Sequence, residues 1–156
     1  NTVGHEPPPI ALPLALTLIR PDLDIWQPGE HNGTFRGFNP ALVTATAALR
    51  AYWRDDALER ASIANGQRIA VALAALARSV SGVEIEARGR GMVHGLAFET
   101  GEAAGRVSAA AFDRGLLVER SGPQDEVVKL LPPLTVTPEE IDHGLALLAD
   151  ALQAAC

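Results

Sequence analysis

Residues 83–98 read VEIEARGRGMVHGLAF, and at this stretch the residue pattern changes to a period of two. In its first half apolar and charged residues alternate, because Val83, Ile85 and Ala87 are separated by glutamates. An alternation with a period of two is typical of a strand that exposes one face. A glycine-rich bend follows, and MVHGLAF then predicts a second, more buried strand. The stretch therefore predicts two consecutive strands of a sheet.

The chain after these strands predicts a helix, two short strands and a closing helix. We expect helices over residues 102–114 and 137–155, with strands over 116–119 and 127–131 between them. From residue 83 the order is therefore β-β-α-β-β-α, and helices most economically cover one face of such a sheet. The predicted fold class is α/β, and the part after residue 83 is an α+β small domain. It has a small, mostly antiparallel sheet with helices packed on one face, preceded by a long helical arm.

The closing helix carries the clearest local signal in the chain. Thr137, Pro138 and Glu140 occupy the N-cap, N1 and N3 positions of a capping box. The helix also has one apolar stripe, made of Ile141, Leu145, Leu148 and Leu152. A capped start followed by such a stripe predicts a helix packed on the sheet.

The helical arm is predicted before the sheet, as two alanine-rich helices over residues 39–53 and 56–79. Asn39 can cap the first of these helices, and Pro40 suits its first helical position. Before the arm, residues 14–19 form a continuous apolar run, which predicts a short buried strand.

Composition limits the classes of partner. The chain has 156 residues, 47% of them hydrophobic, and a net charge of -6, so we expect a globular protein without a nucleic-acid surface. The apolar run at residues 10–19 is too short to span a bilayer, so no membrane partner is predicted. One cysteine, Cys156, excludes an intrachain disulfide, and a reducing, cytoplasmic setting is the simplest interpretation. His5 and His94 lack matched ligand spacing, and no metal site is predicted.

The segment EHNGTFRGFN at residues 30–39 is the first candidate for a binding site. Gly33 allows close approach of the backbone, and Thr34 adds a hydroxyl directly before the first predicted helix. A free hydroxyl beside backbone N–H groups is a suitable anion site. The alternative is a glycine turn that only leads into the helix.

Lys129 is the second candidate, because it is the only lysine in the sequence. A single amine suggests Schiff-base chemistry. It also fits a point charge that binds a carboxylate, without the bidentate geometry of arginine. The third interpretation is a lysine at the end of a strand that faces solvent.

The segments LPLALTLIRPDLDIWQPGEH, NGTFRGFNPA and PPLTVTPEE, in this order, resemble the class III aminotransferases that use pyridoxal phosphate. The likeness runs over residues 12–154. PGEHNGTFRG is most similar to the subfamily that transfers an amino group between a diamino acid such as 2,4-diaminobutyrate and 2-oxoglutarate in ectoine biosynthesis. The resemblance implies the C-terminal portion of a fold-type I aminotransferase.

The resemblance also implies domains and roles. Residues 1–38 would be a strand and the phosphate loop of the large domain, 39–80 connecting helices, and 81–156 the C-terminal small domain. Thr34, with Gly33, would bind the cofactor phosphate of a neighbouring subunit. Lys129 matches the basic residue before PPL that holds a substrate carboxylate. The implied partners are amino acid and 2-oxo acid substrates and a second copy, in a homodimer or higher oligomer.

The chain departs from the family at the Schiff-base lysine. That lysine is expected shortly before the LPLALTL strand, and no lysine precedes Lys129. Covalent attachment of the cofactor at the family position is therefore excluded in this chain, and we predict no catalytic residue. A complementary chain carrying the large domain would then complete the enzyme. The alternative is a catalytically silent interaction or dimerisation module derived from such an enzyme.

Overall fold

The computed structural model describes residues 2–3, 12, 14–30, 33 and 37–156, which form two compact units, 1–57 and 58–156. In the first unit, β1 (Thr2–Val3) pairs antiparallel with β2 (Leu16–Thr17), and the short 3-10 helix η1 (Pro21–Leu23) follows. The strand predicted over 14–19 is thus only two residues long. Leu16 is also exposed, so the predicted burial is wrong for this chain. A two-residue pairing gives no sheet wide enough to bury an apolar strand.

Two long helices follow, as predicted. The first is α1 (Asn39–Tyr52) and the second is α2 (Ala57–Ser79). The prediction that Asn39 caps α1 is wrong, because the N-cap residue is Phe38 and Asn39 is already helical. Pro40 lies in the first turn, where a missing N–H costs no hydrogen bond.

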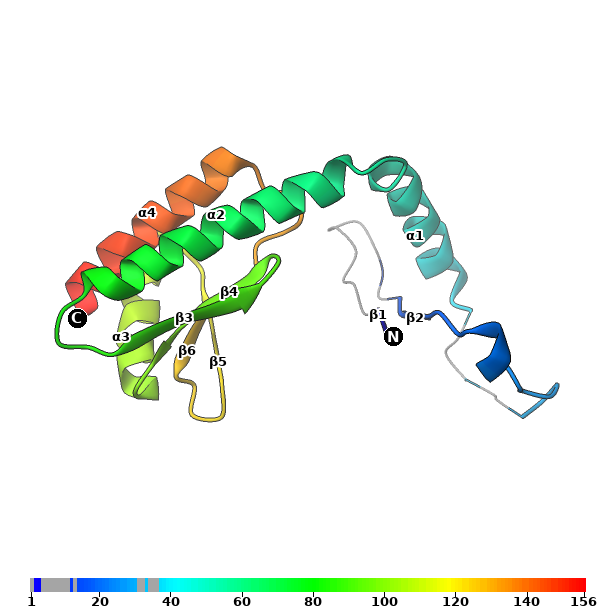
Figure 1. Cartoon of the computed structure of the whole chain (residues 1–156), viewed down its shortest axis with the longest axis horizontal. Helices are drawn as coiled ribbons and strands as arrows, with labels where there is room; N and C mark the ends of the chain where they lie inside the picture. The colour runs from blue at the N-terminus through cyan, green and yellow to red at the C-terminus, as the bar shows by residue number, and fades with distance from the viewer. Residues whose placement is uncertain (1, 4–11, 13, 31–32, 34–36) are drawn as a thin grey trace. The chain divides into compact units, whose positions relative to one another are not determined.

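The second unit contains a four-stranded antiparallel sheet with the order β3-β4-β6-β5 (Figure 1). Its strands are β3 (Ile85–Arg90), β4 (Val93–Phe98), β5 (Glu119–Ser121) and β6 (Val127–Leu130). In β3 half-buried Ile85 and Ala87 alternate with exposed Glu86 and Arg88, which confirms the predicted period of two. Strand β5 begins at Glu119, where the predicted strand ends.

Two further helices complete this unit, α3 (Gly101–Phe112) and α4 (Pro138–Ala155). The buried side chains of α2, α3 and α4 meet those of β4 and β6 in one core, which confirms the predicted α+β arrangement with helices on one face of the sheet. Its largest fully buried side chains are Ile69, Leu73, Leu96, Val107, Val128, Leu148 and Leu152. No helix in the described part of the chain is long and apolar enough to cross a membrane.

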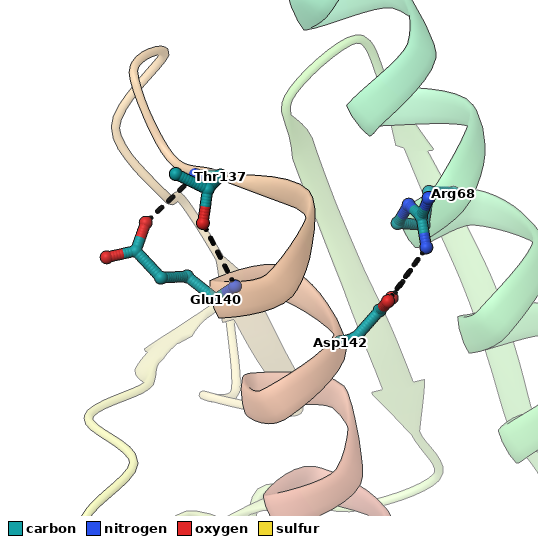
Figure 2. A network of polar contacts seen from close by, with 4 residues as sticks. All are labelled: Arg68, Thr137, Glu140 and Asp142. Carbon is teal, nitrogen blue, oxygen red and sulfur yellow. Dashed lines mark hydrogen bonds and ion pairs between the residues drawn. The ribbon is translucent and has the colours of Figure 1, made fainter.

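Polar contacts fix α4 at its start and along its side (Figure 2). The Thr137 hydroxyl accepts a hydrogen bond from the Glu140 backbone N–H at 3.2 Å, and the Glu140 carboxylate accepts one from the Thr137 N–H at 2.9 Å. The predicted capping box is therefore present. Arg68 of α2 forms an ion pair with Asp142 of α4 at 2.8 Å. The capping contacts fix where α4 begins, and the ion pair joins α4 to α2.

Candidate functional site

The first candidate site lies in the loop before α1. Thr34 lies outside the described residues, while Gly33 is described and half-buried. Gly29 and Gly37, on either side of Gly33 in the sequence, have positive φ values of 89° and 78°. Side chains other than glycine rarely adopt this backbone region. The loop therefore depends on its glycines for its path, as its sequence predicts.

Glu30, at the start of the same loop, has a structural partner. Its carboxylate accepts a hydrogen bond from the Gln27 backbone N–H at 2.8 Å, and its own N–H donates to the Gln27 carbonyl at 3.1 Å. With Pro28 and Gly29 in the middle, residues 27–30 have the residue pattern of a tight turn that requires glycine at its third position. Glu30 thus closes the turn that precedes the candidate phosphate residues.

The start of α1 has the chemical features of an anion-binding site. No side chain caps it among the described residues, and its first turn holds no acidic residue. The unsatisfied N–H groups and the helix dipole favour negative charge at such a start. The structure therefore places a suitable anion environment directly after the candidate phosphate residues in the chain.

The second candidate site surrounds Lys129 on β6. Lys129 is paired in register with Glu119 of β5 on one side and with Gly95 of β4 on the other. Its ammonium forms an ion pair with the Glu119 carboxylate at 2.7 Å. The Lys129 side chain is 26% exposed, so it is neither buried in the core nor a free solvent-facing lysine. Side chains alternate along a strand, and these residues occupy the face opposite to the core residue Val128.

A hollow of about 320 Å³ adjoins this ion pair. Its walls are formed by Leu117, Val118, Glu119, Lys129 and Leu131. Leu117 lies two positions before Glu119, and Leu131 lies two positions after Lys129. Both leucines lie just outside the paired residues of β5 and β6, and they line the hollow beside the charged pair. The hollow therefore combines one cation and one anion with aliphatic walls.

Glu119 is the site residue that sequence reasoning missed. It was predicted as the last residue of a strand, and nothing in its local sequence connects it with Lys129. The connection depends on the register of β5 on β6, which pairs Glu119 with Lys129 and Ser121 with Val127. The turn at residues 122–126 sets that register. A hairpin prediction for residues 119–130 would have found the pair.

His94 is buried and has a structural role. Its Nε2 donates a hydrogen bond to the Gly91 carbonyl at 2.8 Å, which ties the β3–β4 turn to β4. His5 lies outside the described residues. Among the described residues no three His, Cys, Asp or Glu side chains gather closely enough to hold a metal ion.

Comparison with known proteins gives one consistent result. The family model described as Aminotransferase class-III matches residues 12–152. The diaminobutyrate–2-oxoglutarate transaminase of Nocardia farcinica is 57% identical over 145 residues, which are 93% of this chain and 33% of that protein. The enzyme of the same name from Streptomyces avermitilis is 51% identical over 153 residues, which are 97% of this chain and 36% of that protein.

A solved structure supports the same comparison. The lysine aminotransferase from M. tuberculosis matches with a TM-score of 0.74 and 26% sequence identity, over 83% of this chain and 29% of that one. The chain thus spans about a third of the length of the relatives it matches.

Proposed function

This chain belongs to the class III aminotransferases, and we propose that it is the C-terminal part of an enzyme that transfers an amino group between a diamino acid such as 2,4-diaminobutyrate and 2-oxoglutarate. The observation that carries this proposal is the identity of 57% and 51% to two diaminobutyrate–2-oxoglutarate transaminases over almost the whole chain. We extend the proposal to the setting of the reaction, a cytoplasmic step of ectoine biosynthesis.

Pyridoxal phosphate is the cofactor that the family implies. The described residues at the start of α1 are chemically suited to its phosphate group. The start of α1 has no side-chain cap among the described residues and no acid in its first turn, so no carboxylate of that turn opposes an anion. In the proposal Thr34 donates its hydroxyl to the phosphate and Gly33 allows the backbone to come close. When bound, the cofactor supplies the electron sink for amino-group transfer.

Lys129 is proposed to bind a substrate carboxylate and not to form the covalent link to the cofactor. A Schiff base needs the lysine amine free to react, whereas the Lys129 amine forms an ion pair with the Glu119 carboxylate at 2.7 Å. An ammonium beside an open hollow of about 320 Å³ is suited to a carboxylate ligand. The covalent lysine would then come from the two thirds of the enzyme that this chain does not match.

Assembly is part of the proposal. Thr34 would contribute to the cofactor site of a neighbouring subunit, so the active form is a homodimer or higher oligomer, or a complex with a chain that carries the large domain. The division into residues 1–38, 39–80 and 81–156 stays a prediction about the parts of that larger enzyme.

A second candidate function is an interaction or dimerisation module without catalysis. The observation in its favour is the exposed apolar surface of the first unit, where Leu18 and Ile25 are each 77% exposed. Exposed apolar patches mark surfaces that bind other protein. The two candidates differ in whether this chain can support amino transfer when the remaining two thirds are present.

A chimeric enzyme tests the choice between them. The matched 33% of the Nocardia farcinica relative is replaced by this chain, and amino transfer from 2,4-diaminobutyrate to 2-oxoglutarate is measured. We expect activity close to that of the unmodified relative. A chimera that folds and binds pyridoxal phosphate but transfers no amino group would overturn the proposal in favour of the silent module.

Variants of Thr34 in the chimera test the phosphate role. Thr34→Ala removes the hydroxyl donor, and we expect about tenfold weaker binding of pyridoxal phosphate, since one hydrogen bond to a charged group contributes about 1.5 kcal/mol. The matched control is Thr34→Ser, which keeps the hydroxyl and should bind as the parent does. Equal affinity of the alanine and serine variants would contradict the assignment of Thr34. Binding is measured by titration of the cofactor absorbance.

A further inference from the structure

A second hollow, of about 340 Å³, lies between α3 and the edge strand β5. Its floor is one stripe of α3, on which Gly105, Ser108 and Phe112 follow one another at the spacing of helical turns. Its wall includes Leu117 and Arg120 from the chain that enters β5. Among the described residues that line this hollow, none is acidic. The hollow therefore offers a positive charge without a competing carboxylate.

Arg120 lies on the side of β5 that faces α3. It is paired in register with the core residue Val128, and side chains alternate along a strand, so Glu119 lies on the opposite face of the sheet. A Cβ atom built on Gly105 would be 3.2 Å from Arg120 Nη1, which places the guanidinium group over this glycine. In the described part of the chain the guanidinium forms no hydrogen bond or ion pair. Its donors are therefore available to a ligand.

Ser108 adds a hydroxyl one turn along the same stripe of α3. The hydroxyls of Thr44, Thr46 and Ser79 donate hydrogen bonds to carbonyls of their own helices. The Ser108 hydroxyl makes no such bond to any described residue, although the side chain is half-buried and lines the hollow. Helical spacing places Ser108 next to Gly105, and so beside the guanidinium above that glycine. One anion could therefore accept hydrogen bonds from both donors.

The other end of the hollow is apolar. Phe112 lies one turn beyond Ser108 on α3 and is 68% exposed. The chain turns back after α3, because the Leu116 N–H donates to the Ala111 carbonyl at 2.9 Å, and this brings Leu117 to the same end. Leu117 is 83% exposed. Two large apolar side chains thus leave apolar surface that a ligand can cover.

We propose that this hollow binds a small carboxylic acid with an apolar tail. The carboxylate accepts hydrogen bonds from Arg120 and Ser108, and the tail lies on Phe112 and Leu117. A guanidinium group presents two parallel N–H donors, which match the two oxygens of a carboxylate. The volume of about 340 Å³ is within the range of small-molecule sites. The inference is independent of the role proposed for Lys129, which lies on the other face of the sheet.

The lining residues discriminate between classes of ligand. An ammonium group would find no counter-ion among the described lining residues, because none of them is acidic. A bare anion such as phosphate would bind the guanidinium group but would leave Phe112 and Leu117 uncovered. Covering apolar surface contributes to the free energy of binding. The hollow therefore favours a carboxylate with a tail over a bare anion.

Four probes separate these contributions. 3-Phenylpropionate carries the charge and the tail, 3-phenylpropionamide lacks the charge, and acetate and inorganic phosphate lack the tail. Each is titrated into the full ¹⁵N-labelled chain while the amide signals of Ser108 and Phe112 are followed. We expect 3-phenylpropionate to bind about tenfold more tightly than acetate or phosphate, because its ring covers apolar surface. It should bind about fivefold more tightly than the amide, the size of one partly exposed charge interaction.

Variants assign the two parts of the ligand. In Arg120→Gln we expect the preference for 3-phenylpropionate over its amide to disappear, and in Phe112→Ser the preference over acetate should fall. The matched control is Arg90→Gln. Arg90 of β3 is also an exposed strand arginine without an ion pair in the described part of the chain, but it does not line the hollow. This variant should bind as the parent does, and amide spectra check the fold of all variants.

Three results would overturn the inference. If Arg120→Gln binds 3-phenylpropionate as tightly as the parent, the guanidinium group does not hold the carboxylate. If phosphate binds the parent as tightly as 3-phenylpropionate, the hollow is a bare anion site. If no probe moves the signals of Ser108 and Phe112 up to its solubility, the hollow is not a ligand site. These measurements involve neither Thr34 nor amino transfer, so the proposed function stands or fails separately.

Discussion

Gly66 has no side chain, and this allows α2 to lie close to the β3–β4 turn. A Cβ atom built on Gly66 of α2 would collide with the carbonyl oxygen of Gly91 in that turn. Gly91 has a φ of 60°, and its carbonyl already accepts the hydrogen bond from His94. The turn can therefore move away only by straining a residue that is itself fixed. Glycine inside a helix lowers stability, and here the close packing against the turn explains why a glycine is present.

We predict that Gly66→Ala destabilises the chain by about 1–3 kcal/mol, because overpacking against backbone outweighs the gain in helix propensity. The control is Gly144→Ala in α4, where the nearest atom to a new Cβ is Leu116 Cδ1 at 3.6 Å. That variant should be as stable as the parent or more stable by up to about 1 kcal/mol. Urea unfolding followed by circular dichroism measures both. Equal effects at the two positions would contradict the packing argument.

Helices and strands of this chain differ in how far their own residues determine where they begin. Helix α4 begins where Thr137, Pro138 and Glu140 predict, because all the capping contacts lie within four residues. Strand β5 begins later than predicted. Leu116 and Val118 have strand-like sequence, but they pack against the core without pairing to β6, and the ladder starts only at Glu119.

For helix α4 we predict that Thr137→Ala lowers the free energy of unfolding by about 1 kcal/mol, because the N-cap hydrogen bond from the Glu140 N–H is lost. Thr137→Ser keeps an acceptor oxygen and should lose only a few tenths of that. Thermal and urea unfolding of the parent and both variants provide the comparison. A serine variant as unstable as the alanine variant would show that the threonine methyl group, and not the cap, is responsible.

At the scale of the whole molecule, the two compact units differ in how well their apolar residues are covered. Residues 58–156 enclose a core with fully buried side chains from three helices and two strands. In residues 1–57 large apolar side chains such as Leu18, Ile25 and Val43 remain exposed. The exposed side chains agree with the proposal that this chain is part of a larger enzyme, in which other protein covers them.

We predict that the isolated chain self-associates at micromolar concentration, because burying these side chains is favourable. The double variant Leu18→Ser, Ile25→Ser should associate more weakly. A matched control is Val71→Ser on α2, which changes an exposed side chain of the other unit. Sedimentation velocity over a range of concentrations gives the result. A clean monomer for the parent chain would contradict the prediction.

Features that arise from neighbouring residues could be predicted from the sequence. The period of two at residues 83–88, the glycine-rich bend after it, the capping box of α4 and the two long helices all depend on contacts or preferences within a few positions. Local physics acts the same way wherever the segment lies, so these elements could be predicted without the fold. The family resemblance was confirmed for the same reason, since it rests on contiguous motifs.

Contacts between residues that are distant in the sequence depend on the tertiary structure. It placed Gly95 of β4 opposite Lys129 of β6, joined Gly66 of α2 to Gly91, and set Asn65 of α2 to donate a hydrogen bond to the Val136 carbonyl at 3.0 Å. Residues so far apart in sequence have no local preference for each other. Their meeting depends on strand register and on how the helices pack into one core, and both are properties of the folded unit as a whole.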